Sequence, residues 1–157
     1  PGLRVGWIVA PTAYLQAAVT LKQATDLHTP HLNQMVTCKV AQEIYEPHVE
    51  LLRTSYREKR DCMIVSMRRS LPQNIKFTEP QGGMFVWLTL PEGADSAALL
   101  DRSLDEAKVA YIPGAPFFAT AEDGRRHCRL SFSGVSIEQI EAGIERFGVF
   151  LATALNE

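Results

Sequence analysis

The clearest alternation of apolar and polar positions in the chain lies at residues 126–134. The apolar residues there are Cys128, Leu130 and Phe132, and polar residues stand between them. A period of two predicts a half-buried strand, with the apolar residues against a core and the others on the opposite face. The pattern therefore places Arg129 on the polar face of this strand.

Apolar residues at helical spacing predict helices in the first half of the chain. One runs from residue 12 to about residue 26, and the next begins after Thr29, which can cap it. Pro47 interrupts the four-residue repeat of this second helix. Because proline is favoured in a first helical turn, we expect a new helix to start there and to end before Pro72.

The second half of the chain mixes strands with helices. Strands are predicted at 75–77, 84–90 and 109–112, after a first one at 3–10, and helices at 95–108 and from the capping box 136–139 onward. The strand at 84–90 is apolar on both faces, so we expect it to be central, with Phe85 and Trp87 in the core. Gly82, Gly83 and Gly114 are interpreted as backbone turns. This order of elements indicates an α+β fold, with helices on a mostly antiparallel sheet.

Composition and charge narrow the class of protein. The 157 residues, of which 46% are hydrophobic and 22% charged, suffice for one soluble domain with a sizeable core. The formal net charge of -2 gives no electrostatic basis for binding nucleic acid or an anionic membrane. The three cysteines are far apart, which predicts free thiols in a reducing cytoplasm and neither a disulfide framework nor a metal site. They are Cys38, Cys62 and Cys128.

Arg129 is the candidate binding residue that the pattern itself provides. A guanidinium fixed on a strand can donate two parallel hydrogen bonds to a carboxylate, and it keeps its charge at any workable pH. The alternative is a solvated arginine on the outer face of an antiparallel strand, which is the commoner situation. Spacing alone leaves both interpretations open.

Several short sequence motifs are distributed over nearly the whole chain. They are Pro1-Gly2-Leu3-Arg4-Val5-Gly6-Trp7, Ala24-Thr25-Asp26-Leu27-His28-Thr29-Pro30 followed by Leu32-Asn33-Gln34, Pro80-Gln81-Gly82-Gly83-Met84-Phe85-Val86-Trp87, Pro113-Gly114 with Phe117, and Arg129-Leu130-Ser131-Phe132-Ser133. Together they resemble the C-terminal portion of fold-type I aminotransferases that use pyridoxal phosphate. The resemblance is to the 2-aminoadipate and kynurenine aminotransferase branch of that family.

The resemblance implies roles for two arginines. Arg4 would hold the phosphate of the cofactor, pyridoxal 5'-phosphate, and Arg129 would hold the α-carboxylate of the substrate. The implied reaction transfers an amino group between an amino acid, 2-aminoadipate-like and of broad range, and a 2-oxo acid. A homodimer is implied as well, with the chain divided into 1–29, the last strand and helix of a large cofactor-binding domain, and 30–157, the small domain with its linking helix.

The chain departs from the family in one respect. The catalytic lysine that bonds to the cofactor is expected upstream of Pro1, so we expect no catalytic residue in this chain and no transaminase activity from the chain alone. None of the five lysines stands at the motif position; they are Lys22, Lys39, Lys59, Lys76 and Lys108.

Other marked residues receive structural interpretations. His28 and His31 flank a helix start and are expected to cap it or to lie at the surface, although the resemblance places this neighbourhood near a dimer interface. His127 and Cys128 are interpreted as structural, with Cys128 a small core residue. Two other functions stay open. One is the effector domain of a winged-helix transcription regulator, and the other is an autonomous domain that only binds.

Overall fold

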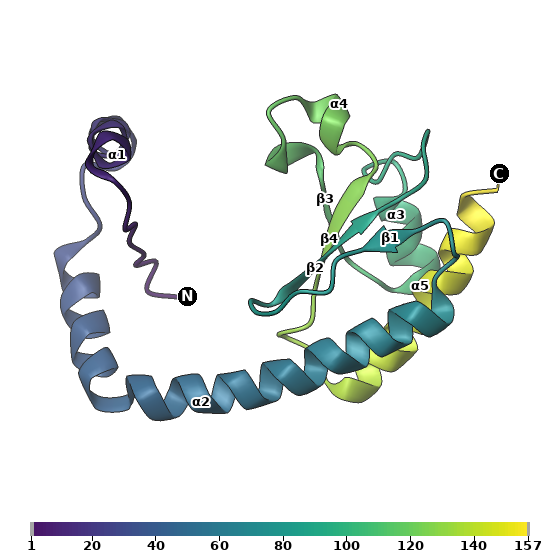
Figure 1. Cartoon of the computed structure of the whole chain (residues 1–157), viewed down its shortest axis with the longest axis horizontal. Coiled ribbons are helices and arrows are strands. Elements are labelled where there is room, and N and C mark those ends of the chain that lie inside the picture. The colour runs from purple at the N-terminus through teal and green to yellow at the C-terminus, as the bar shows by residue number, and fades with distance from the viewer. Residues whose placement is uncertain (1, 157) are drawn as a thin grey trace. The chain divides into compact units, whose positions relative to one another are not determined.

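The computed structural model describes residues 2–156, and Figure 1 labels its helices and strands. The chain divides into two compact units, of which the first ends at Leu51 and the second begins at Leu52. All strands among the described residues belong to the second unit. The division into 1–29 and 30–157 follows from the family resemblance and stays a prediction.

The first unit contains α1 (Thr12–Thr25), which confirms the predicted helix, and the beginning of α2. The strand predicted over 3–10 is wrong, because residues 4–11 have no regular secondary structure and no described strand pairs with them. A lone strand would leave its backbone N–H and C=O groups without partners, so alternating side chains alone do not make one. Trp7 and Val9 in this stretch are exposed.

The helix α2 (His31–Ser70) is continuous, and Pro47 lies inside it. The predicted start of a new helix at Pro47 is therefore wrong. Proline removes one N–H donor and crowds the preceding turn, a penalty of about 3 kcal/mol, and long helical runs on both sides keep the helix intact. The predicted end before Pro72 is confirmed. The last turns of α2 bury Met63 and Met67.

Four strands form one antiparallel sheet in the order β1-β2-β4-β3 within residues 2–156. They are β1 (Lys76–Phe77), β2 (Phe85–Thr89), β3 (Ile112–Pro113) and β4 (His127–Ser131). The sheet confirms the strand predicted around Arg129 and the central place of the 84–90 strand. The strand predicted at 109–112 begins only at Ile112, since its earlier residues lie outside the ladder.

Helical segments flank the sheet in the second unit. They are α3 (Leu100–Arg102), continued by the π-helical turn η1 (Ser103–Ala107), the 3₁₀ turn η2 (Ala115–Phe117), α4 (Ala121–Gly124) and α5 (Ile137–Ala154). The predicted capping box is present, because the Ser136 hydroxyl accepts from the Gln139 N–H and the Gln139 side chain accepts from the Ser136 N–H. The helix predicted over 95–108 begins only at Leu100, and the cap predicted at Asp95 is wrong, because Leu99 is the N-cap of α3 and makes no side-chain cap. Asp95 Oδ1 instead accepts from the N–H of Ala97 at 2.9 Å, in the turn before α3.

Asp95 is held as a carboxylate by its surroundings. Burial raises its pKa, but hydrogen bonds from two backbone N–H groups and from Arg125 outweigh that effect, and the pKa lies below its ordinary value. The Arg125 Nε lies 3.0 Å from the Asp95 Oδ2. This pair ties the start of the α3 segment to the residues just before β4.

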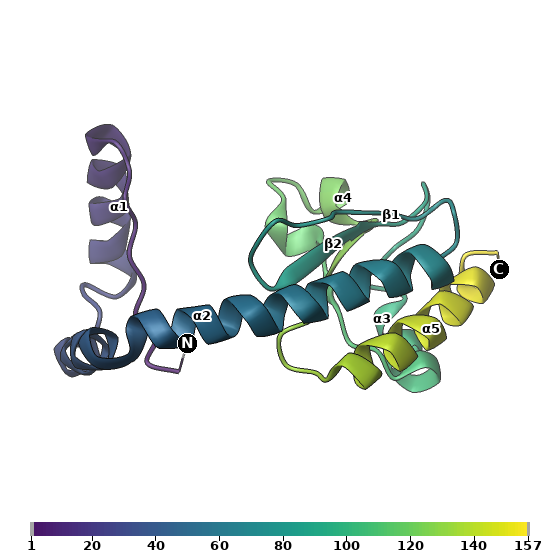
Figure 2. The ribbon, with the colours of Figure 1, turned by 60° about the horizontal axis from the view of Figure 1, so that its bottom comes forward.

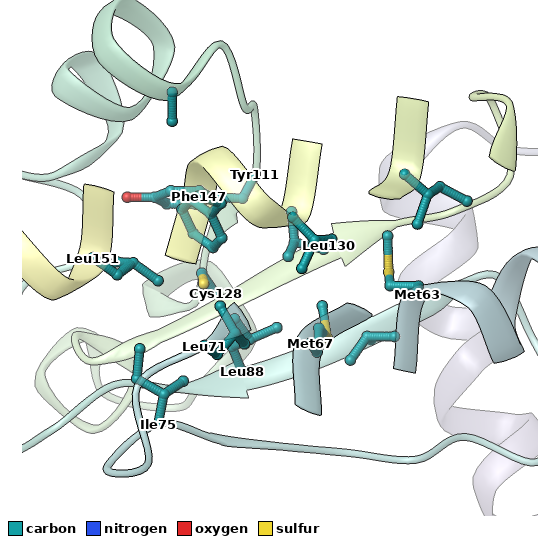
Figure 3. Close-up of a cluster of buried hydrophobic side chains, with 14 of the residues drawn as sticks. Met63, Met67, Leu71, Ile75, Leu88, Tyr111, Cys128, Leu130, Phe147 and Leu151 are labelled. Atoms are coloured by element: carbon teal, nitrogen blue, oxygen red, sulfur yellow. The ribbon is translucent and has the colours of Figure 1, made fainter. Parts of the chain in front are cut away.

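The core lies on the side of the sheet that α2 and α5 cover, while α4 lies on the other side (Figures 1 and 2). Figure 3 shows Leu88 of β2 and Cys128 of β4 among side chains from both helices, including Met67 and Phe147. Cys128 is fully buried, which confirms its predicted place, and burial raises the pKa of its thiol to about 12. All three cysteines are free thiols, as predicted.

Two glycines of α5 have very different surroundings. A Cβ at Gly148 would collide with the backbone carbonyl of Ser70 at the end of α2, whereas a Cβ at Gly143 would meet nothing closer than Val109 Cγ2, at 3.9 Å. The two helices thus approach closely at Gly148, and only a residue without a side chain fits there.

We expect Gly148→Ala to lower the free energy of unfolding by about 1–3 kcal/mol, because either the helices separate or the backbone shifts. Gly143→Ala is the matched control. It should leave the stability unchanged or raise it by about 0.5–1 kcal/mol, because alanine is the better helix former. Chemical denaturation of the chain measures both. Equal effects of the two substitutions would contradict the close approach of α5 to α2.

Candidate functional site

The face of the sheet opposite the core, here called the open face, carries the candidate site. On β2 this face holds Phe85 and Trp87, and on β4 it holds His127 and Arg129, because these residues alternate with the buried ones. Trp87 pairs with Arg129 in the β2–β4 register. The core placement predicted for Phe85 and Trp87 is wrong, since both lie on the face opposite the core and Phe85 is 38% exposed. Where both faces of a strand are apolar, the pattern does not tell which face is covered.

Arg129 is held by aromatic rings. Its Cζ atom lies 3.9 Å from the centroid of the Phe85 ring and 4.8 Å from that of Phe117. Among residues 2–156, the Arg129 Nε is buried and has no hydrogen-bond partner. A buried charged donor without a partner is costly, which favours a ligand that accepts from it.

Trp87 and His127 form the rest of this face together with Thr89. The indole N–H of Trp87 donates to His127 Nδ1 at 3.2 Å, and the Thr89 hydroxyl lies 3.1 Å from the same nitrogen. An indole nitrogen only donates, so a neutral His127 carries its proton on Nε2. The His127 ring also stacks on Phe118, with centroids 5.0 Å apart. These contacts agree with the structural role predicted for His127.

A close backbone contact holds the loop of residues 114–118, here called the aromatic loop, on this face. The Gly114 N–H donates to the His127 carbonyl at 2.7 Å, and a Cβ at Gly114 would lie 2.5 Å from the His127 Cβ. Its φ of -77° is ordinary, so proximity, and not backbone strain, requires glycine there. Phe117, in η2, is positioned by this contact. Gly83, with φ of 79°, needs glycine for its conformation, as a turn predicts.

The exit of β4 is fixed to α2 by a lysine. Lys59 Nζ donates to the Ser133 carbonyl at 3.0 Å, and the hydroxyls of Ser131 and Ser133 lie 3.1 Å apart. Two further lysines form ion pairs on helix surfaces, Lys22 with Asp26 and Lys39 with Glu43.

Arg4 belongs to the first unit. It is exposed, has φ of 55°, and follows Leu3, whose carbonyl accepts from the Asn33 side chain at 2.9 Å. A left-handed conformation is uncommon for arginine and costs about 1–2 kcal/mol. Within the described residues the Arg4 guanidinium makes no ion pair or hydrogen bond. Its exposed side chain is available to an anion.

The remaining candidates do not form a site. His28 is exposed and its Nδ1 lies 2.9 Å from the Thr29 carbonyl, while His31 is the first residue of α2. No group of three or more potential metal ligands occurs among residues 2–156. Over the same residues, no helix has both the length and the apolarity that crossing a membrane requires.

Sequence reasoning missed Phe85 and Phe117 as partners of Arg129. Phe85 lies diagonally across the β2–β4 ladder from Arg129. This contact depends on the register of the two strands, which cannot be derived from either strand's sequence alone. The signal available in the sequence was the aromatic character of Phe85 and Phe117, which the structure leaves exposed.

Known proteins match nearly the whole chain. The model of the family "Aminotransferase class I and II" matches residues 1–147. A 2-aminoadipate transaminase of Thermus thermophilus is 43% identical over 94% of this chain. An HTH-type transcriptional regulator of Bacillus subtilis is 26% identical over 96% of the chain and 31% of its own length. The chain spans 37% of the length of the transaminase.

Solved structures agree with these relatives. The crystal structure of an α-aminoadipate aminotransferase from Thermus thermophilus, complexed with N-(5'-phosphopyridoxyl)-L-leucine, superposes with a TM-score of 0.81 at 41% identity. The match covers 99% of this chain and 40% of that one. This likeness confirms the α+β fold.

Proposed function

We propose that this chain, which belongs to the aminotransferase class I and II family, provides the substrate-carboxylate receptor of a pyridoxal-phosphate-dependent aminotransferase. The reaction is the transfer of an amino group between an amino acid and a 2-oxo acid. The observation that carries the proposal is Arg129, whose buried Nε has no partner among the described residues.

The geometry of Arg129 suits a carboxylate. A guanidinium offers parallel N–H donors that match the two oxygens of a carboxylate, and each charge-assisted bond contributes about 1.5–3 kcal/mol. The Arg129 Cζ lies over the rings of Phe85 and Phe117, and a ring offers no oxygen or nitrogen acceptor, so these contacts leave the N–H donors to the ligand. A strand in the middle of a sheet is a rigid support for such a receptor.

The residues present also fit the cofactor. A phosphate is bound well by an unengaged arginine, and Arg4 is exposed and has no described partner. Pyridoxal phosphate acts as an electron sink when a bond at the substrate Cα breaks. The task left to Arg129 is orientation, because a substrate fixed by its carboxylate presents its Cα–H in one direction only.

Specificity and assembly complete the proposal. We infer a 2-aminoadipate-like and broad range of amino donors, supported by the 43% identity to a protein named for that substrate. A cytoplasmic homodimer is part of the same inference. The catalytic lysine lies outside this chain in the proposed enzyme, which is supported by the 37% of the relative's length that the chain spans.

A transcription regulator with an aminotransferase-like effector domain is the second candidate. It is supported by the 26% identity to an HTH-type regulator. The reading frame upstream of Pro1 discriminates between the two, because a helix-turn-helix segment far upstream identifies the regulator.

The carboxylate role of Arg129 predicts a large kinetic effect in the full-length protein. Arg129→Ala should lose about 3–5 kcal/mol of transition-state binding, because two charge-assisted bonds are lost. The corresponding fall in kcat/KM for amino acids is more than about 100-fold. Arg129→Lys should recover only part, since an ammonium cannot form the fork. Arg125→Ala is the control, because Arg125 is bonded to Asp95 instead. A loss below about fivefold in Arg129→Ala would refute the assignment.

The phosphate role of Arg4 predicts a separate effect. Arg4→Gly removes the guanidinium while glycine tolerates the φ of 55°, so a backbone change is avoided. Titration of the full-length apoprotein with pyridoxal phosphate should give a dissociation constant raised by about tenfold or more. Arg129→Ala should leave that constant within about twofold. If Arg4→Gly binds the cofactor as tightly as the parent protein, Arg4 is only structural.

The chain by itself should not transaminate. Lys22 and Lys39 form ion pairs, and Lys59 donates to the Ser133 carbonyl. Lys76 and Lys108 are exposed, so no lysine is placed in a site as the amine that the chemistry needs. After incubation of the chain with pyridoxal phosphate and reduction with borohydride, peptide mapping should find scattered, substoichiometric labelling. Stoichiometric labelling of one lysine together with turnover of an amino acid would contradict this.

A further inference from the structure

The described contacts of the Arg129 guanidinium are with aromatic rings. Its guanidinium lies against two phenylalanine rings, at 3.9 Å from the Phe85 centroid and 4.8 Å from the Phe117 centroid. Among residues 2–156, the Arg129 Nε is buried without a hydrogen-bond partner. Within the described residues, the contacts of this guanidinium are therefore with ring faces.

We propose that Phe85 is a positioning residue, which stacks under the Arg129 guanidinium and directs its hydrogen-bonding edge to the substrate carboxylate. The inference rests on the proposed function of Arg129 and adds a residue to it. In this role Phe85 acts only through Arg129 and not by contact with the substrate.

The register of the sheet explains how Phe85 reaches Arg129. Trp87 pairs with Arg129, and Phe85 stands two residues before Trp87 on the same face of β2. Such diagonal neighbours on an antiparallel pair are within reach of an aromatic side chain. The short loop before β2, with Gly83 in a left-handed conformation, fixes where Phe85 begins the strand.

A ring is well suited to this task because it does not compete with the ligand. The attraction between a cation and an aromatic ring acts on the flat face of the guanidinium. The N–H donors all point along the edge, so stacking consumes none of them. A carboxylate partner inside the protein would orient Arg129 equally well, but it would occupy the donors that the substrate needs.

The other aromatic residues of the face have different partners. Trp87 contacts Phe117, Phe118 and His127. Phe118 stacks on His127 and makes no described contact with the Arg129 guanidinium. Phe118 is 37% exposed and Phe85 is 38% exposed, so the two phenylalanines match in type, face and burial. Phe118→Leu is therefore the control for Phe85→Leu.

Kinetics of the full-length protein test the positioning role. Phe85→Leu should raise KM for the amino acid, and the inhibition constant of the non-reacting carboxylate 3-phenylpropionate, by about five- to thirtyfold, with kcat within about threefold. Phe85→Tyr keeps the ring face and should stay within about threefold of the parent. Phe118→Leu should stay within about twofold. If Phe118→Leu equals Phe85→Leu, or if tyrosine does not rescue, the proposal is overturned.

A second measurement does not depend on activity. In the ¹⁵N-arginine spectrum of the 157-residue chain, the Arg129 Nε–Hε signal should be shifted upfield by the ring currents of Phe85 and Phe117. Phe85→Leu should move it toward the position of the unstacked arginines, and Phe118→Leu should not. An unmoved signal overturns the proposal, as does a moved signal with unchanged KM. A normal kcat/KM in Arg129→Ala would instead remove the proposed function, whatever the spectrum shows.

Discussion

The antiparallel pairing of β2 with β4 is the interaction on which the rest of this chain depends. It fixes the register in which Trp87 meets Arg129, and it sends alternate residues of both strands to opposite faces. On one face Leu88 and Cys128 enter the core beneath α2 and α5. On the other face the same backbone presents an arginine among aromatic rings. A shift of one residue would exchange the two faces and would bury the charge of Arg129.

Close backbone contacts stabilise this two-sided arrangement at its edges. Gly148 allows α5 to approach the end of α2, and Gly114 allows the aromatic loop to approach β4. Lys59 fixes the exit of β4 through the Ser133 carbonyl. The result is a rigid sheet whose open face is shaped by η2, the turn that carries Phe117. Binding of the proposed carboxylate on that face would require little rearrangement of the sheet, which keeps the cost of ordering low.

Much of this fold could be predicted because local signals agreed with the tertiary structure. The alternation around Arg129 and the capping box at Ser136 are such signals, and both are confirmed. The strand expected over 3–10 failed, since a strand requires a partner and its own sequence does not state whether one exists. The role of Phe85 was missed for a related reason: contact with Arg129 depends on register, which is a property of two segments. The helix start predicted at Pro47 was wrong for a different reason, because the surrounding helix outweighed the local preference of proline for a first turn.

The inside–outside alternation of β4 also has an evolutionary consequence. Neighbouring codons of one short strand are exposed to different kinds of selection. Changes at Cys128 or Leu130 act on folding, whereas a change at Arg129 acts on the open face. A lineage can therefore exchange a polar side chain of that face while the alternate residues of the same strand preserve the fold.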